Sequence, residues 1–142
     1  MNLAIVGAGY TGTRLARACL REGADVLAMT RAPHRQAELN ALGARCVALD
    51  LDGDGPWAAV SDIAGRDIFY MVPPADAGDR DPRMGRFLAA LSAEPGCLVY
   101  LSTTAVYGDC GGERVDENSP TRPASDRGRR RLDAERQALD WG

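Results

Sequence analysis

The chain has 142 residues, and its basic residues are 17 arginines with no lysine. The lack of lysine excludes Schiff-base enzymes and phosphate-binding loops of the GxxxxGK[ST] type. The single histidine, His34, excludes metal sites with several imidazole ligands. A net charge of −3 argues against a general nucleic-acid binder, and 45% apolar and 26% charged residues are typical of an ordinary globular protein.

The four cysteines are far apart in the sequence and show none of the short spacings of zinc sites. We therefore predict no metal site, and free thiols in a reducing cytoplasm. The N-terminal apolar run is too short for a membrane span and lacks the basic start of a signal peptide, so no membrane association is expected.

Strands and helices are expected to alternate along the chain. Apolar runs predict buried strands at 2–6, 26–30, 46–49, 68–72 and 98–101. Periodicity with Pro and Gly signals predicts helices at 11–22, 33–42, 57–64, 83–93 and 127–139. Parallel neighbours need crossover connections, which are helical here. The pattern thus predicts an α/β fold with a Rossmann-type doubly wound parallel sheet of about five strands.

Three glycines follow the first strand and open the first helix in a GxGxxG pattern. Gly7 permits a tight turn, Gly9 lets the backbone approach a pyrophosphate, and Gly12 lets helix and strand pack closely. The helix N-terminus offers N–H groups and a positive dipole end to phosphates. The predicted dinucleotide-binding residues of this turn are Gly7, Gly9, Tyr10, Thr11 and Gly12. The alternative is a glycine turn without a ligand.

The end of the second strand indicates which dinucleotide is bound. Thr30 and Arg31 stand where an acidic residue would bind the ribose 2′-hydroxyl of NAD, and Arg35 follows four residues after Arg31. A guanidinium pairs with a 2′-phosphate, so we predict NADP, with NAD less favoured. The alternative is that both arginines carry only solvated loop charge.

Residues that end the third and fourth strands are expected to complete the cofactor crevice. Asp50 either faces the adenine edge or only shapes a turn beside Gly53. Val72 and Pro73 end the fourth strand, so their backbone should line the same crevice at the carboxyl edge of the sheet.

The segment LSTTAVYGD at 101–109, followed by VDE at 115–117 and Pro120, resembles a known family over the whole chain. The family is the atypical and extended short-chain dehydrogenase/reductases, the NAD(P)-dependent epimerase/dehydratase superfamily. Its members bind NAD(P) on a Rossmann fold and usually act on nucleotide sugars or related carbonyl and alcohol compounds. The resemblance implies that Thr103 hydrogen-bonds the reacting oxygen, unless it only satisfies a strand end. Tyr107 lies nearby as a substitute acid.

Further on, the family carries Tyr-x-x-x-Lys on a helix with Glu four residues after the Lys, and Glu135 anchors that pattern here. Arg127 then takes the tyrosine position and Arg131 the lysine position. Arg131 can hold the nicotinamide ribose, whereas Arg127 cannot donate the proton because a guanidinium keeps its own. The role that remains for Arg127 is electrostatic, namely to stabilise an oxyanion or to bind an anionic substrate. The alternative is a solvated helix face with ion pairs such as Arg129 to Asp133.

Family chains continue into a substrate-binding lobe that is absent from this sequence. Residues 1–142 are therefore expected to form one NAD(P)-binding domain. The chain is then either a fragment or an unusually short member of the family. We predict an oxidoreductase or epimerase/dehydratase-like protein with hydride transfer at the nicotinamide and an unknown small-molecule substrate. Two alternatives are a non-catalytic NADP-binding sensor that has lost the Tyr-Lys pair, and a ketoacid-reductase-type enzyme, which leaves STTAVYG unexplained. The family's helices at 82–94 and 124–140 often form a dimer interface, which implies a homodimer.

Overall fold

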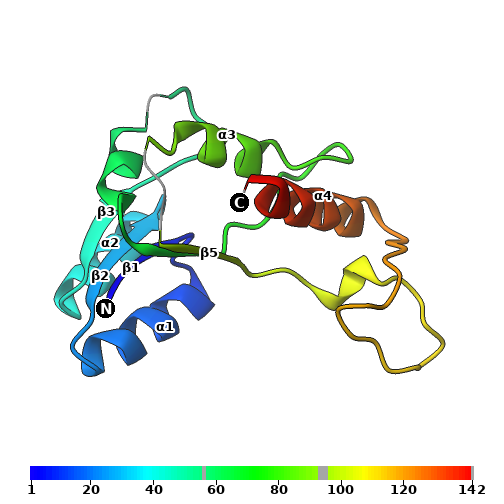
Figure 1. The fold of residues 1–142 in the computed structure, drawn as a ribbon. Helices are drawn as coiled ribbons and strands as arrows, with labels where there is room; N and C mark the ends of the chain where they lie inside the picture. The colour runs from blue at the N-terminus through cyan, green and yellow to red at the C-terminus, as the bar shows by residue number, and fades with distance from the viewer. Residues whose placement is uncertain (56, 93–95, 142) are drawn as a thin grey trace. The chain divides into compact units, whose positions relative to one another are not determined.

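The computed structural model describes residues 1–55, 57–92 and 96–141, and its strands and helices alternate along the chain (Figure 1). The strands are β1 (Asn2–Val6), β2 (Asp25–Thr30), β3 (Arg45–Ala48), β4 (Asp67–Tyr70) and β5 (Cys97–Tyr100). The α-helices are α1 (Tyr10–Arg21), α2 (Pro33–Ala41), α3 (Pro82–Ala90) and α4 (Asp126–Trp141). Two short 3-10 helices are η1 (Ala58–Ile63) and η2 (Thr104–Val106).

The five strands form one parallel sheet in the order β3-β2-β1-β4-β5, which confirms the predicted doubly wound fold. The chain moves from β1 outward to β3 and then crosses back to β4 on the other side of β1. Val6 is in register with Met29 of β2 and with Tyr70 of β4, so three strands end at the same edge. The strand order reverses between β1 and β4, where sheets of this kind bind their ligands.

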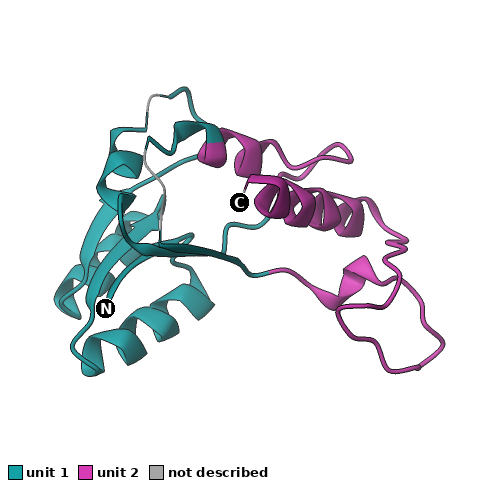
Figure 2. Ribbon diagram, viewed as in Figure 1, with its two compact units in different colours: residues 1–73, 89–101 teal, residues 74–88, 102–142 magenta. Residues whose placement is uncertain are grey.

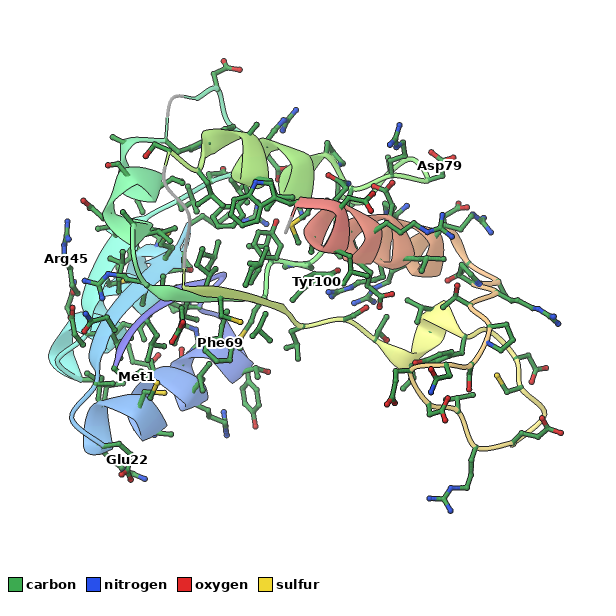
Figure 3. All side chains as sticks on the ribbon, viewed as in Figure 1. Met1, Glu22, Arg45, Phe69, Asp79 and Tyr100 are labelled. Carbon is green, nitrogen blue, oxygen red and sulfur yellow. The ribbon has the colours of Figure 1, made fainter. Side chains whose placement is uncertain are left out.

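The central strand is buried on both faces, as its apolar sequence predicts. Leu3 and Ile5 belong to a core cluster with Ala16 of α1 and Leu39 of α2. Helix α1 packs on β1 and β2, and α2 packs on β2 and β3. Figure 3 shows Phe69 and Tyr100 pointing to opposite faces of the sheet, as the alternation of side chains along a strand requires.

Most predicted boundaries differ from the structure by one or two residues, and three elements need a correction. The fourth strand ends at Tyr70 and not at Val72, because after the Met71 N–H bonds the Val6 carbonyl the backbone packs against the turn at Gly7. The predicted helix at 57–64 is the 3-10 helix η1. The predicted helix at 83–93 is α3, which ends at Ala90, and position 93 lies outside the described residues.

The chain divides into two compact units, coloured separately in Figure 2. The first unit comprises residues 1–73 and 89–101 and contains the whole sheet with α1 and α2. The second unit comprises 74–88 and 102–142, with α4, η2 and most of α3. A single domain over 1–142 therefore stays a prediction. None of the helices in the described ranges is long and apolar enough to cross a membrane.

Candidate dinucleotide-binding site

The glycine turn joins β1 to α1 and is tied to the end of β2. The N–H groups of Gly7 and Ala8 both donate to the carbonyl of Met29, at 3.0 and 2.8 Å. The Gly9 N–H donates to the Gly7 carbonyl at 2.8 Å. Gly7 has a φ of +88°, a conformation that residues with a Cβ rarely adopt. The turn therefore lies at the carboxyl edge of the sheet, beside the residues that follow β2.

Each glycine of the turn has a different environment. A Cβ built on Gly7 would lie 2.7 Å from the Val72 nitrogen, so the backbone after β4 packs directly against the turn. A Cβ on Gly12 would lie 3.0 Å from Cγ2 of Ile5, which brings α1 close to β1. A Cβ on Gly9 would meet nothing within 4 Å. The turn thus has open space only at the middle glycine, where the sequence pattern expects a pyrophosphate to approach.

Helix α1 begins at this open space. No side chain caps the helix at Gly9, and the Thr13 hydroxyl donates back to the Gly9 carbonyl at 2.8 Å. The first N–H groups of a helix have no partner within it, so those of Tyr10, Thr11 and Gly12 can bind an anion. Arg14 places its guanidinium 3.6 Å from the centre of the exposed Tyr10 ring. These donors, the helix dipole and the nearby cation fit the pyrophosphate of a dinucleotide.

Thr30, Arg31 and Arg35 follow the end of β2, next to the glycine turn. The Thr30 hydroxyl accepts from the Ala32 N–H at 3.3 Å and thereby shapes the start of α2. The Arg31 side chain is 66% exposed. Arg35 is paired with Glu38 at 2.8 Å along α2. Contact of the two arginines with a 2′-phosphate stays a prediction, and Arg31 is the more accessible of the two.

Asp50 shapes the turn after β3. Its carboxylate accepts from the Asp52 N–H at 3.1 Å, and its carbonyl accepts from the Gly53 N–H at 3.4 Å and from the Trp57 indole at 2.7 Å. The Asp50 carboxylate also lies 3.9 Å from Arg31. A turn role for Asp50 is therefore visible in its hydrogen bonds, and a contact with adenine stays a prediction.

The residues predicted for chemistry lie in the second unit. Thr103 precedes η2 with an extended backbone, and its hydroxyl oxygen accepts from the Ala105 N–H at 3.3 Å. Tyr107 follows η2 and is half-buried. A Cβ on Gly128 of α4 would lie 3.0 Å from the Ala105 carbonyl, so η2 packs against the first turn of α4. The unit thus brings the Thr103–Tyr107 segment beside the start of α4, where Arg127 is located.

The helix positions that the family pattern gives to tyrosine and lysine carry arginines of different exposure. Arg127 is exposed, and Arg131 is half-buried. Arg130 between them contradicts the alternative of a wholly solvated helix face, because it is only 7% exposed and donates to the Gly78 carbonyl at 2.6 Å. The arginine run therefore presents some guanidinium groups to solvent and buries others.

Asp133 does not make the expected ion pair with Arg129, which pairs with Asp126. Asp133 accepts instead from the Asp81 N–H at 2.8 Å, from Arg80 at 3.3 Å and from Gln137 at 2.6 Å. Its partners come from the segment before α3 and from the next turn of α4. Sequence reasoning missed this network because residues 80 and 81 lie more than fifty positions away in the chain.

Two further buried charges complete the second unit. Arg83 is 7% exposed and donates to the Pro74 carbonyl at 3.0 Å. Asp81 is 1% exposed, and its carboxylate accepts from the Arg83 N–H at 3.1 Å. Burial raises the pKa of the Asp81 carboxyl, opposed by hydrogen bonds from nearby backbone N–H groups and by the Arg83 charge. The sequence signal for this buried polar network is the spacing of Arg130, Asp133 and Gln137, which places the three side chains on one face of the final helix.

Comparisons with known proteins show the family and the fold of the chain. The model of the NAD dependent epimerase/dehydratase family matches residues 3–142. A conserved protein of unknown function from Silicibacter pomeroyi DSS is 34% identical with a TM-score of 0.74, and the match covers 96% of this chain and 47% of that one. UDP-glucuronic acid 4-epimerase from Bacillus cereus, solved with NAD, is 20% identical with a TM-score of 0.76, covering 99% and 52%.

A UDP-galactose 4-epimerase is 18% identical with a TM-score of 0.79, and the match covers 99% of this chain and 51% of that one. The chain therefore spans about half the length of these solved structures. The two sugar epimerases share its fold. No curated protein matches the chain significantly.

Proposed function

The chain belongs to the NAD dependent epimerase/dehydratase family, and we propose that it binds NADP at the turn of residues 7–12, with NAD as the less favoured dinucleotide. We further propose that the bound dinucleotide takes part in hydride transfer with a small-molecule substrate, as in an oxidoreductase or epimerase. The observation that carries the proposal is the open space at Gly9, between a turn packed on Val72 and an uncapped helix α1.

The preference for NADP rests on Arg31, whose exposed guanidinium follows the strand end that is hydrogen-bonded to the glycine turn. A guanidinium binds a phosphate through two parallel N–H bonds, and no 2′-phosphate is present in NAD. Arg31→Gln should therefore weaken NADP binding about tenfold and leave NAD binding unchanged, as measured by isothermal titration calorimetry. Equal NADP affinities of the parent chain and Arg31→Gln would contradict the assignment of Arg31 to the 2′-phosphate.

The second unit supplies the groups proposed for chemistry. The Thr103 oxygen accepts from the Ala105 N–H, so its O–H is available to donate to a substrate oxygen. Arg131 would hold the nicotinamide ribose, and Arg127 would stabilise an oxyanion or an anionic substrate without moving a proton. Tyr107 is the candidate for proton transfer in place of the missing tyrosine. When bound, the nicotinamide supplies or accepts the hydride.

Thr103→Ala should reduce turnover about a hundredfold with unchanged NADP affinity, because it removes a donor at the reacting oxygen. Thr103→Ser should restore turnover, since it keeps the hydroxyl. The measurement is NADPH absorbance during reaction with a panel of carbonyl compounds. Full turnover by Thr103→Ala would remove Thr103 from the mechanism.

A second candidate function is that of a non-catalytic NADP-binding sensor or regulatory module. The exposed Arg127 at the tyrosine position favours it, because a guanidinium does not exchange protons near neutral pH. The same absorbance assay separates the two functions. NADP binding without hydride transfer to any compound of a broad panel would favour the sensor, and stoichiometric NADPH oxidation would favour the enzyme.

We also propose that the chain forms a homodimer through α3 and α4. We place the protein in the reducing cytoplasm, where its four free thiols would persist. Multi-angle light scattering should give about twice the mass of the chain at micromolar concentration. A monomeric mass over the whole concentration range would remove the dimer.

A further inference from the structure

The loop that follows β3 is acidic and well anchored in the first unit. It carries Asp50, Asp52 and Asp54 within the sequence DLDGDG. Leu51 is buried, and the Trp57 indole donates to the Asp50 carbonyl at 2.7 Å. The Asp52 N–H donates to the Asp50 carboxylate at 3.1 Å, so the Asp50 side chain closes this turn. The loop backbone and the Asp50 carboxylate are therefore positioned by packing and hydrogen bonds.

Two of these carboxylates face Arg31. Its Nη1 atom lies 3.4 Å from an Asp52 oxygen and 3.9 Å from an Asp50 oxygen. The arrangement follows from the sheet, because Thr30 of β2 is in register with Ala48 of β3 and both strands end at the same edge. The guanidinium proposed to bind the 2′-phosphate is thus already paired with two anions through one of its nitrogens.

We propose that Asp52, with Asp50 in a smaller role, sets the discrimination between NADP and NAD by competing for Arg31. This inference rests on the proposed binding of the 2′-phosphate by Arg31. When Arg31 binds a phosphate end-on, through Nη1 and Nη2, it must release or share Nη1. The 2′-phosphate, itself an anion, also approaches the two carboxylates and is repelled by them. NAD carries no 2′-phosphate, so its affinity is not lowered in this way.

The size of the effect follows from exposure. The Arg31 side chain is 66% exposed and the Asp52 side chain 40% exposed, and an ion pair with this much access to solvent is weak and screened by salt. Asp52→Asn should therefore raise NADP affinity about fivefold at low salt and leave NAD affinity within about twofold. Asn keeps the size of the side chain and removes its charge. The NADP gain should shrink at high salt, because the competing charges are screened.

The test compares three neutralised aspartates by calorimetric titration with NADP and with NAD. Asp52→Asn should give the largest gain in NADP affinity and Asp50→Asn a smaller gain, in the order of their distances to Arg31. Asp54→Asn is the matched control, with the same charge change in the same loop. Equal NADP gains from Asp52→Asn and Asp54→Asn would overturn the role of the ion pair, because they would reflect general loop charge.

The double variant Arg31→Gln with Asp52→Asn separates this inference from the proposed function. The NADP gain of Asp52→Asn should fall to about twofold or less when Arg31 is absent, because the carboxylate then has no guanidinium to occupy. If Arg31→Gln leaves NADP affinity unchanged, the proposed NADP contact is wrong and the inference fails with it. If Arg31→Gln weakens NADP binding but Asp52→Asn does not strengthen it, the competition alone is wrong.

Discussion

Both units bury apolar side chains, but among the described residues the buried charged side chains all lie in the second unit. In the first unit the central strand β1 is apolar and fully buried from Leu3 to Val6, and its buried neighbours in the core cluster are aliphatic. In the second unit Asp81, Arg83 and Arg130 are all less than a tenth exposed. The first unit is thus stabilised by the burial of apolar surface around a sheet. In the second, charged side chains hold backbone groups of separate segments together.

The difference shows where a sequence pattern carries structural information. Apolar periodicity marks a buried strand because every member of the strand obeys the same local rule. No local sequence pattern predicts a buried arginine, because its burial is tolerated only through partners elsewhere in the chain. In the arginine run 129–131 the middle residue is buried and donates to Gly78, while Arg129 is exposed.

The largest expected effect on the free energy of unfolding comes from a substitution in the first unit. Gly7→Ala should lower the free energy of unfolding by about 3 kcal/mol, because Gly7 has a φ of +88° and its new Cβ would strike the Val72 backbone. Gly23→Ala is the matched control. Gly23 also has a positive φ but open space around it, so its loss should be about 1 kcal/mol. Equal losses in urea denaturation would contradict the close contact at Gly7.

A smaller loss is expected from the polar network of the second unit. Asp133→Ala should cost about 2 kcal/mol of unfolding free energy, since it leaves the N–H of the buried Asp81 without its acceptor and removes one of the two acceptors of the Gln137 amide. Asp126→Ala, which removes an exposed partner of Arg129, should cost less than about 1 kcal/mol. If the two variants unfold at the same urea concentration, the network does not hold the second unit together.

The smallest effect is a pH dependence that belongs to the second unit. Burial raises the pKa of Asp81, so the folded state holds its proton more tightly than the unfolded chain does. The stabilisation of the folded state by this proton is fully present below the unfolded-state pKa of about 3.9, and it is lost as the pH rises through the folded-state pKa. Asp81→Asn keeps an acceptor for the Arg83 N–H but does not titrate.

The unfolding free energy of Asp81→Asn, relative to the parent chain, should therefore rise as the pH is increased from about 4 through the folded pKa of Asp81. Urea denaturation of both proteins over this range gives the difference directly. A difference that stays constant or falls with pH would contradict the raised pKa.

The sheet and the glycine turn could be predicted because their determinants are local. Buried strands follow from apolar runs, and the pattern of Gly7, Gly9 and Gly12 can be read within six residues, although the atoms that exclude a Cβ at Gly7 belong to the distant Met71–Val72 segment. The apolar run predicts an end of β4 that is two residues too late, because Met71 and Val72 are apolar but pack against the turn at Gly7. In an apolar run the sequence therefore locates the middle of a strand better than its ends.

The remaining site contacts could not be predicted because they join distant positions. Asp52 meets Arg31 across twenty-one positions, through the pairing of β2 with β3. Asp133 meets Asp81 across fifty-two positions. A charge pattern along one helix predicts pairs three or four residues apart, as seen for Arg129 and Asp126, but gives no information on a partner from another element.

The central claim is that the turn of residues 7–12 holds a dinucleotide, and calorimetric titration of the parent chain and Gly9→Ala with NADP tests it most directly. A Cβ at Gly9 meets nothing in the protein, so the variant should keep its stability but lose about tenfold or more in NADP affinity, because the pyrophosphate approaches that atom. Equal affinities of the two proteins, or no binding by the parent chain, would contradict the account.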